Sequence, residues 1–432
     1  MSGDQTLLDM LEKISKKSVS EIREDDFYEE KIEYKKITKI DRDVDYIITG
    51  SSWATEIINE KILDTSKVIN RIKKEHIFSK LILHLTTNYE LKKDQTETML
   101  NKYLTHILKN GYSQNDLTQF LEDVNGIPPS WYNYIKLRGI VVKNDVLVGK
   151  YHFREPKKQD LNLIINSHFL GPIHFPFPHA ILEFDNDHML GHKNQEDIIN
   201  LIEILKLFTL SAISYDGYRM KTRSFNASYF GGELFTGRER SDKPVFHLKK
   251  DDNTNLFTFI NFMTNKIGNV VHQKTNTPIN IAFQRYNDSL VKLVGPEEKL
   301  TSAIMGLEAL FLTGGQDLSY QLRIKAAKLL GYLNEPPEEV LSTLKKSYTF
   351  RSKFIHGSIL REKDTHKVNA LLDLCRNYLR KVLIYWFYHN IKSEKEKTRF
   401  LSDIEKSLIN DHTSHKIKMQ ASEMINNLPG VF

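Results

Sequence analysis

The C-terminal part of the chain repeats the apolar spacing of amphipathic helices, which restricts it to a mainly helical fold. From about residue 252 onward, apolar side chains recur at the three- and four-residue spacing of amphipathic helices. Thr313-Gly314-Gly315 is typical of a helix end, and Glu335-Pro336-Pro337-Glu338 suits a helix start. The pattern predicts an all-α bundle over residues 276–432. One helix is predicted before the bundle, near 254–267, and those of the bundle lie near 279–292, 297–313, 318–331, 337–350 and 366–392.

Two of these predicted helices are strongly apolar. The segment 297–313 carries Leu300, Ile304, Leu307, Leu310 and Phe311 on one face. The segment 366–392 is apolar over more than a narrow stripe and includes Tyr378, Trp386 and Phe387. A helix of this width is expected either at the centre of the bundle or at a subunit interface.

Residues 1–127 are predicted to be mainly helical. Helical patterns occur near 54–74, 76–91 and 94–109, and a short β-capable patch lies at 45–49. Asn110-Gly111 indicates a helix end, and Ser113 with Asp116 indicates the next start. These short helices permit a DNA-binding helix-turn-helix, although amphipathic helices more often simply pack together.

Gly126-Ile127-Pro128-Pro129-Ser130 marks a predicted boundary, after which the chain becomes strand-like. Residues 139–142, 146–153 and 180–184 have strand character, Asn144-Asp145 is a plausible hairpin turn, and a helix is predicted near 195–213. The fold class is therefore multidomain. We expect an N-terminal helical region (1–127), an α+β module (128–275) and the helical bundle (276–432).

Composition sets further bounds. A chain of 432 residues is too long for one ordinary core. The net charge of +6 suits a polyanionic partner, although a lysine-rich composition explains it equally well. Cys375 is the only cysteine, which excludes an internal disulfide and favours a reducing compartment. Without a signal-peptide pattern or an apolar run of membrane length, we expect a cytoplasmic protein that does not contact membranes.

The sequence gives little sign of a metal or nucleotide site. Five histidines fall in one short span, and two of them have the spacing of a zincin helix, but Met189 replaces the required glutamate and Gly191 argues against a helix there. The five are His168, His174, His179, His188 and His192. No phosphate-binding Gly-x4-Gly-Lys motif occurs. We therefore predict no cofactor and no metal.

Arg351 and His356 are the best candidates for chemistry. Arginine holds phosphate groups, and histidine moves protons near neutral pH. Other arginine–histidine pairs of similar spacing lie in charged or loop-like runs, whereas this pair is interleaved with apolar residues. We expect those residues, Phe350, Phe354 and Ile355, to fix both side chains in place.

Three segments in this order carry a family resemblance. They are 305–312 (Met-Gly-Leu-Glu-Ala-Leu-Phe-Leu), 318–331 (Leu-Ser-Tyr-Gln-Leu-Arg-Ile-Lys-Ala-Ala-Lys-Leu-Leu-Gly) and 348–358 (Tyr-Thr-Phe-Arg-Ser-Lys-Phe-Ile-His-Gly-Ser). Together they resemble the Apea-like branch of the HEPN superfamily over roughly residues 277–395. The resemblance implies a bundle that dimerises and pools two Arg-x(4–6)-His motifs. It also implies a metal-independent endoribonuclease of toxin–antitoxin, CRISPR-associated or phage-defence type.

Carried onto this chain, the resemblance makes Arg351 and His356 catalytic. Ser352 stands where asparagine, aspartate or histidine is commoner, a mild departure, and some members of the family have lost catalysis and only bind. Lys353 and Tyr348 lie close enough to add phosphate contacts. Glu308 and Arg323 are expected to act as structural residues behind the site.

The expected chemistry uses the 2′-OH of RNA as the nucleophile. His356 would act as acid or base, and Arg351 would stabilise charge on phosphorus. A homodimer formed through the bundle would supply one histidine for each proton transfer, and the N-terminal region would bind a phage or cellular trigger.

Other interpretations stay open from the sequence. His356-Gly357 also fits an ordinary helix C-terminus, and Arg351 could simply pair with Glu308. The chain could then be a non-catalytic module that binds RNA or a protein, or less plausibly a DNA-binding regulator.

Overall fold

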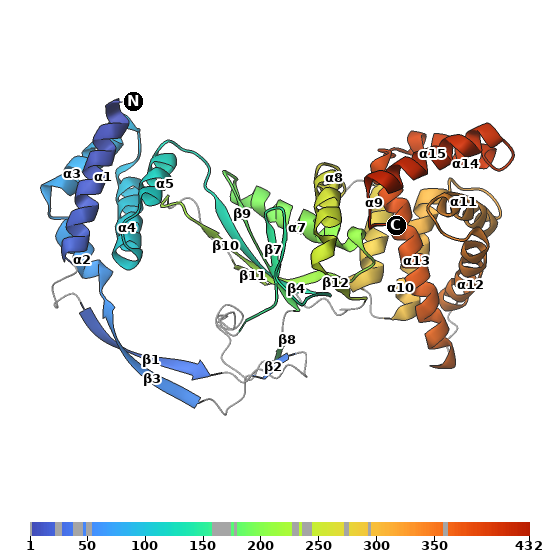
Figure 1. Cartoon of the computed structure of the whole chain (residues 1–432), viewed down its shortest axis with the longest axis horizontal. Coiled ribbons are helices and arrows are strands. Elements are labelled where there is room, and N and C mark those ends of the chain that lie inside the picture. The colour runs from blue at the N-terminus through green and yellow to red at the C-terminus, as the bar shows by residue number, and fades with distance from the viewer. Residues whose placement is uncertain are drawn as a thin grey trace.

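The computed structural model describes eleven stretches of the chain, within which the statements below hold: 2–21, 28–37, 46–48, 54–157, 174–176, 179–226, 233–235, 244–271, 276–292, 295–356 and 362–432. Helices predominate, and a small antiparallel sheet lies between them. Figure 1 shows the N-terminal helices at one end of an elongated molecule, the sheet in the middle and the C-terminal helices at the other end.

Five helices form the N-terminal end: α1 (Ser2–Glu21), α2 (Thr65–Ile72), α3 (His76–Asn88), α4 (Lys93–Asn110) and α5 (Gln114–Val124). The predicted stop after Asn110 is confirmed, because Gly111 follows at a φ of 82°. The predicted start is confirmed as well, since the Ser113 side chain accepts a hydrogen bond from the Asp116 N–H at 3.3 Å. Both signals are local, which is why the sequence revealed them.

The predicted helix over 54–74 is wrong in its first half. Residues Ala54–Leu63 form strand β3, which pairs antiparallel with β1 (Tyr28–Ile37) from Tyr28 opposite Leu63 to Ile37 opposite Ala54. The β-branched residues Thr55, Ile57 and Ile58 suit a strand. The partner strand lies well upstream in the chain, so the periodicity of 54–74 alone could not reveal it.

The central sheet has six strands in the order β11-β10-β4-β9-β7-β6, and every neighbouring pair is antiparallel. Two further pairs lie beside it: β2 with β8, antiparallel, and β5 with β12, parallel. The strands are β2 (Tyr46–Ile48), β4 (Trp131–Arg138), β5 (Ile140–Val142), β6 (Val146–Val148), β7 (Tyr151–Arg154), β8 (His174–Pro176), β9 (Ala180–Asn186), β10 (Ser214–Thr222), β11 (Glu233–Phe235) and β12 (Phe246–Leu248).

Three details of the predicted α+β module are corrected. The run 146–153 is two strands, because the chain turns at Gly149, whose φ of 57° is left-handed. Asn144-Asp145 does not close a hairpin, since β5 pairs with β12 instead of β6. Gly191 does not prevent a helix; it begins one, and a Cβ there would lie 3.3 Å from the Trp131 ring.

Two helices accompany the sheet: α7 (Gly191–Phe208), which replaces the predicted 195–213, and α8 (Asn253–Val271), which follows a 3-10 turn at Lys250–Asp252. The C-terminal region is helical in all its described elements. These are α9 (Pro278–Asn287) with a π-helical turn (Asp288–Lys292), α10 (Pro296–Phe311), α11 (Leu318–Tyr332), α12 (Pro337–Ile355), α13 (Glu362–Tyr388), α14 (Glu394–Lys406) and α15 (Asp411–Asn427). The last two were not predicted.

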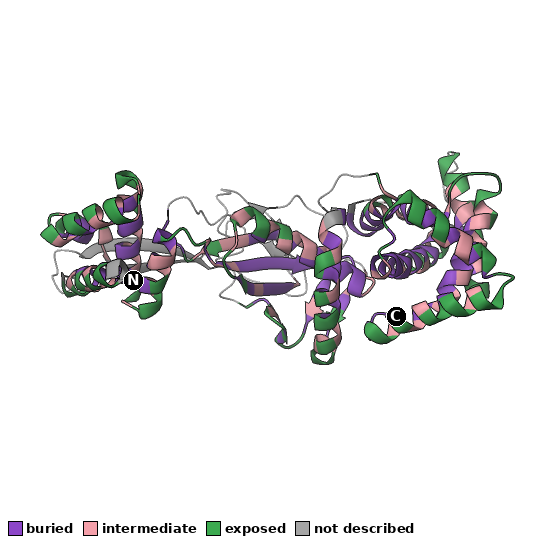
Figure 2. Cartoon of the chain, turned by 90° about the horizontal axis from the view of Figure 1, so that it is seen from above, coloured by how far each residue is buried: buried purple, intermediate pink, exposed green. Residues whose placement is uncertain are grey.

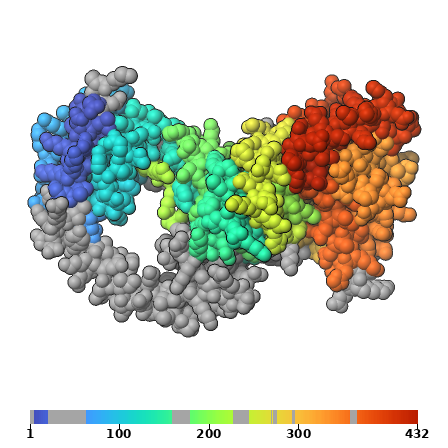
Figure 3. Space-filling view, in the orientation of Figure 1, coloured from blue at the N-terminus to red at the C-terminus, as the bar shows by residue number. Residues whose placement is uncertain are grey.

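Buried apolar side chains form two separate cores. One joins α1–α5 and includes Phe225, which follows β10. The other is continuous from Ile135 to Val431 and runs through the sheet, α7, α8 and the C-terminal helices. Figure 2 shows buried residues along the strands of the sheet and along the C-terminal helices, and Figure 3 shows the α7–α8 region in close contact with the C-terminal helices. The domain boundaries expected near residues 127 and 275 stay predictions.

Helix α13 lies at the centre of its bundle. Tyr378, Leu379, Trp386 and Phe387 are all buried within the chain itself. The alternative, that this wide apolar surface forms a subunit interface, is therefore wrong for these residues. The five predicted core residues of α10 (Leu300, Ile304, Leu307, Leu310 and Phe311) are buried as expected.

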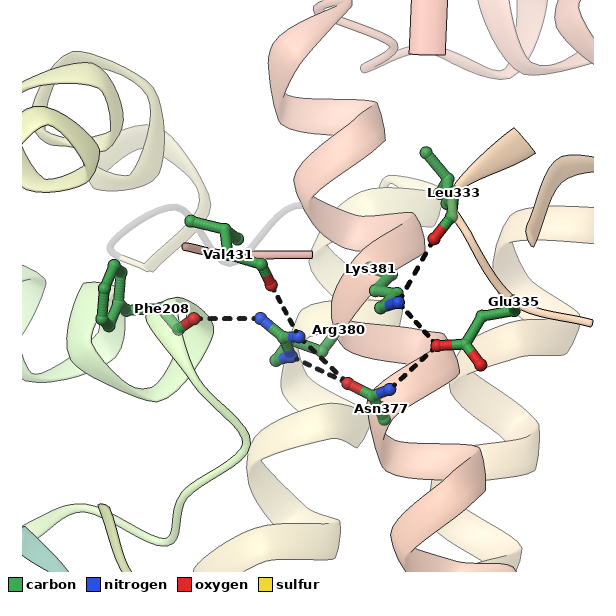
Figure 4. A network of polar contacts seen from close by, with 7 residues as sticks. All are labelled: Phe208, Leu333, Glu335, Asn377, Arg380, Lys381 and Val431. Atoms are coloured by element: carbon green, nitrogen blue, oxygen red, sulfur yellow. Dashed lines mark hydrogen bonds and ion pairs between the residues drawn. The ribbon is translucent and has the colours of Figure 1, made fainter. Parts of the chain in front are cut away.

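A buried cation joins α13 to the sheet side of the molecule (Figure 4). The Arg380 guanidinium donates hydrogen bonds to the carbonyls of Leu207 and Phe208 at 3.0 Å and of Val431 at 2.9 Å. Tyr286 donates to the neighbouring Lys206 carbonyl at 2.7 Å. The last carbonyls of α7 have no partner inside their own helix, so these side chains satisfy them and offset the negative end of the helix dipole.

Candidate functional site

The candidate site lies at the end of α12. This helix is amphipathic: Val340, Thr343, Leu344 and Ser347 face the core, and Glu338 and Glu339 occupy its first turn, where the helix dipole favours acids. The helix continues five residues beyond the predicted segment, to Ile355, with His356 as its C-cap. Gly357 and Ser358 lie outside the described residues.

Arg351 is held by α10. Its Nη2 lies 3.1 Å from the Glu308 Oε2, and the two side chains are only 21% and 18% exposed. The Tyr348 hydroxyl donates a hydrogen bond to the other Glu308 oxygen, and the guanidinium lies 5.2 Å from the centre of the Tyr348 ring. Arg351 therefore pairs with Glu308, as the sequence suggested, and the arginine, the tyrosine and the glutamate form one polar cluster.

Tyr348 stays protonated in this cluster and acts as a hydrogen-bond donor. Burial, followed by the hydrogen bond to Glu308 and the charge of that carboxylate, raises the pKa of Tyr348 to about 12. The hydroxyl therefore keeps its proton at any physiological pH. Among the described residues, the buried Nε of Arg351 has no hydrogen-bond partner. One donor of the guanidinium is thus unsatisfied in this arrangement.

His356 differs from Arg351 in its surroundings, because its side chain is exposed, as are Ser352 and Lys353. Residues five apart on a regular helix point about 140° away from each other. No hydrogen bond or ion pair joins Arg351 to His356 in the described part of the chain. One chain in this conformation directs the arginine toward α10 and the histidine toward solvent.

The expectation that Phe350, Phe354 and Ile355 fix the pair in place is wrong for two of the three. Phe350 packs against the core, but Phe354 is 36% exposed and Ile355 is 56% exposed. The helical period places Phe354 on the same face of α12 as Ser347, and Ile355 on the same face as Leu344, but in this last turn the face is exposed. The motif therefore ends in an exposed apolar pair.

Arg323 is not part of the Glu308 cluster in the described contacts. It lies on α11, where its Nε donates to the Ser319 carbonyl at 3.0 Å and its guanidinium lies 5.8 Å from the Tyr320 ring centre. None of these contacts joins Arg323 to Arg351 or Glu308, so they do not support the predicted role of Arg323 behind the site.

The histidine cluster is dispersed where it is described. His179 accepts a hydrogen bond from the Gly139 N–H at 3.1 Å, His188 lies 3.1 Å from the Pro128 carbonyl, and His192 is exposed on α7. The side chains of His168 and His174 lie outside the described residues. Within those residues, no group of three or more potential ligands is placed to hold a metal ion, and no helix is long and apolar enough to cross a membrane.

The sequence reasoning missed Lys345 and Lys346, which are exposed on the outer face of α12. The signal was present: no acidic residue occurs from 340 to 361, whereas five lysines and arginines do. Comparison of the chain with models of known protein families, with curated proteins and with solved structures finds no match.

Proposed function

We propose that the chain is a metal-independent endoribonuclease of HEPN type, acting in a prokaryotic defence or toxin system. The observation that carries the proposal is the end of α12. A permanent cation paired to a carboxylate and a solvent-exposed histidine lie five residues apart there, on a helix whose outer face is basic.

The chemistry needs a base, an acid and charge stabilisation. His356 removes the proton from a ribose 2′-OH or donates one to the leaving 5′-oxygen. Arg351 stabilises the negative charge that develops on phosphorus. The products carry 2′,3′-cyclic phosphate and 5′-hydroxyl ends. Because Glu308 holds Arg351 in one place, the cation is oriented before the RNA arrives.

The assay is cleavage of total RNA by the full chain in EDTA, with analysis of the fragment ends. Arg351→Ala and His356→Ala should each remove cleavage while the protein still unfolds cooperatively. Cleavage that requires a divalent ion, or that survives either substitution near the wild-type rate, would contradict the assignment.

The Arg351–Glu308 pair also fits a second function, a bundle that binds RNA without cutting it, since a paired arginine is less available to phosphate. The same assay separates the two. Binding of RNA by the wild-type chain with no cleavage under any condition would favour the binding function.

The working unit is proposed to be a two-fold dimer. Cleavage involves two proton transfers, and a single chain offers one histidine that diverges from its arginine. Two copies would pool these groups in one cleft. Exposed Phe354 and Ile355, adjacent to His356, are the proposed contact, in place of the buried α13 surface.

Ile355→Glu should shift the protein from dimer to monomer and remove cleavage together. Ile409→Glu is the matched control, because Ile409 is 93% exposed in the turn after α14. Light scattering gives the mass of each variant. A monomeric Ile355→Glu chain that cuts at the full rate would show that each motif works alone.

The N-terminal helices are proposed to bind the trigger. A defined contact links them to the sheet: Asp123 accepts hydrogen bonds from the Ser224 hydroxyl and the Phe225 N–H, both at 2.6 Å. Phe225 enters the N-terminal core, 5.2 Å from the Tyr103 ring. A movement of α4 or α5 would therefore displace the residues that follow β10, because Asp123 and Tyr103 contact them.

A further inference from the structure

The outer face of α12 is a continuous polar and basic surface. On a regular helix its residues fall within a sector of about 120°, and all are exposed. We call this surface the α12 stripe; it consists of Ser342, Lys345, Lys346, Thr349, Ser352, Lys353 and His356. From Lys345 to His356 the stripe is about 16 Å long.

The stripe lysines have no evident structural task. Among the described residues, none of Lys345, Lys346 and Lys353 forms an ion pair, and no acid lies within a helical turn of any of them in the sequence. The helix dipole favours cations only in the last turn. It can account for Lys353 but not for Lys345 and Lys346, which lie almost three turns before the helix end.

Charge along α12 is also polarised. Glu338 and Glu339 are exposed at its start, after which residues 340–361 carry five basic side chains and no acidic one. Of the described members of this run, only Arg351 forms an ion pair, with Glu308. A polyanion is therefore attracted to the second half of the helix and repelled from the first.

We propose that the α12 stripe binds the sugar–phosphate backbone of single-stranded RNA and directs it to His356. Lysines spread along one face of a helix can follow one backbone, as basic grooves do when they bind single strands. The identity of the polyanion as RNA rests on the proposed function. The stripe adds the binding path and its direction: the strand lies along Lys345 and Lys346 and reaches His356 at the helix end.

The test measures binding apart from cleavage. The full chain carrying His356→Ala is titrated into a fluorescein-labelled single-stranded RNA, and anisotropy is read at several salt concentrations. Adding Lys345→Glu and Lys346→Glu should weaken binding by about tenfold or more at low salt. It should also reduce the slope of log affinity against log salt by about 1.4, which is about 0.7 for each lost phosphate contact.

Lys416→Glu with Lys418→Glu is the matched control, because it reverses two exposed lysines on α15 and changes the net charge equally. Its affinity should stay within about twofold of the parent. Equal weakening by both pairs would show a general charge effect and overturn the proposal, as would RNA binding that neither pair weakens or the absence of binding. Cleavage of total RNA by the wild-type chain is scored separately, so the proposed ribonuclease can stand when the stripe fails.

Discussion

At the scale of single residues, Glu308 sets the position of the Arg351 guanidinium by pairing with it. The carboxylate takes one hydrogen bond from the guanidinium and another from the Tyr348 hydroxyl. Most of both charged side chains is shielded from water. Removing one charge from such a pair leaves the other inadequately compensated.

Glu308→Gln should therefore lower the free energy of unfolding by about 1–2 kcal/mol, which allows for the partial exposure of the pair. Tyr348→Phe should cost about 1 kcal/mol, the value of one hydrogen bond. Chemical denaturation gives both values, and the double variant tests their coupling. Strictly additive losses would mean that the three groups do not form one cluster.

His389 predicts a pH dependence of stability. It follows α13, its ring centre lies 4.3 Å from that of Tyr385, and its Nε2 is buried without a hydrogen-bond partner in the described residues. Burial, and next the charge of Lys266, lowers the pKa of His389 from 6.5 to about 4. Between these values the unfolded chain binds a proton that the folded chain does not, so stability falls as the pH falls.

We expect this residue to remove about 2 kcal/mol between pH 6.5 and pH 4, allowing for its contact with solvent. His389→Phe should lose less stability over the same range, as measured by urea denaturation at each pH. Parallel pH curves for the two proteins would exclude His389 as the cause.

At the scale of elements, α10 and α13 approach each other closely at Gly306. A Cβ on Gly306 would lie 2.5 Å from the Leu379 Cδ2 and 3.3 Å from the Ala282 carbonyl oxygen. Both neighbours belong to the packed core and have little room to move.

Gly306→Ala should therefore destabilise the protein by about 1–3 kcal/mol, despite the higher helix propensity of alanine. Gly268→Ala on α8 is the control, because its nearest contact would be ordinary, 3.5 Å from the Asn200 Nδ2. That change should be neutral or stabilise by up to about 1 kcal/mol. Equal thermal shifts for the two variants would contradict this packing argument.

The same elements show what a sequence can predict. Helices with local end signals, such as α4 with Gly111 and α5 with Ser113, were identified to within a few residues. Strand β3 was not, because its pairing with β1 is non-local. The Arg351–Glu308 pair was anticipated. The exposure of Ile355 was not, since it lies on the same helix face as the buried Leu344 and the sequence does not reveal where along α12 the core stops covering that face.

At the scale of the whole molecule, the C-terminal helices share their core with the sheet. Phe259 and Met263 of α8 belong to the same buried cluster as Leu383 of α13. Arg380 and Tyr286 satisfy the end of α7 across this junction. A fragment that begins near residue 276 would expose the junction to water.

We therefore expect residues 276–432 alone to unfold without cooperativity or to aggregate, whereas residues 128–432 should melt cooperatively. Calorimetry of the two fragments beside the full chain measures this. The shorter fragment is thus a poor test of whether the N-terminal region restrains cleavage, and the longer one is suitable. A sharp melting transition for residues 276–432 would show that the bundle is independent.

The contacts of Arg380 also bear on how the chain is made. The carbonyls of Leu207 and Phe208 lie 173 and 172 residues before the arginine that satisfies them. At about 5–20 residues per second, a ribosome needs roughly 10–30 s to reach that arginine after finishing α7. During this interval the carbonyls at the end of α7 lack the guanidinium that satisfies them, so we expect the nascent chain to be prone to aggregation until α13 has been made.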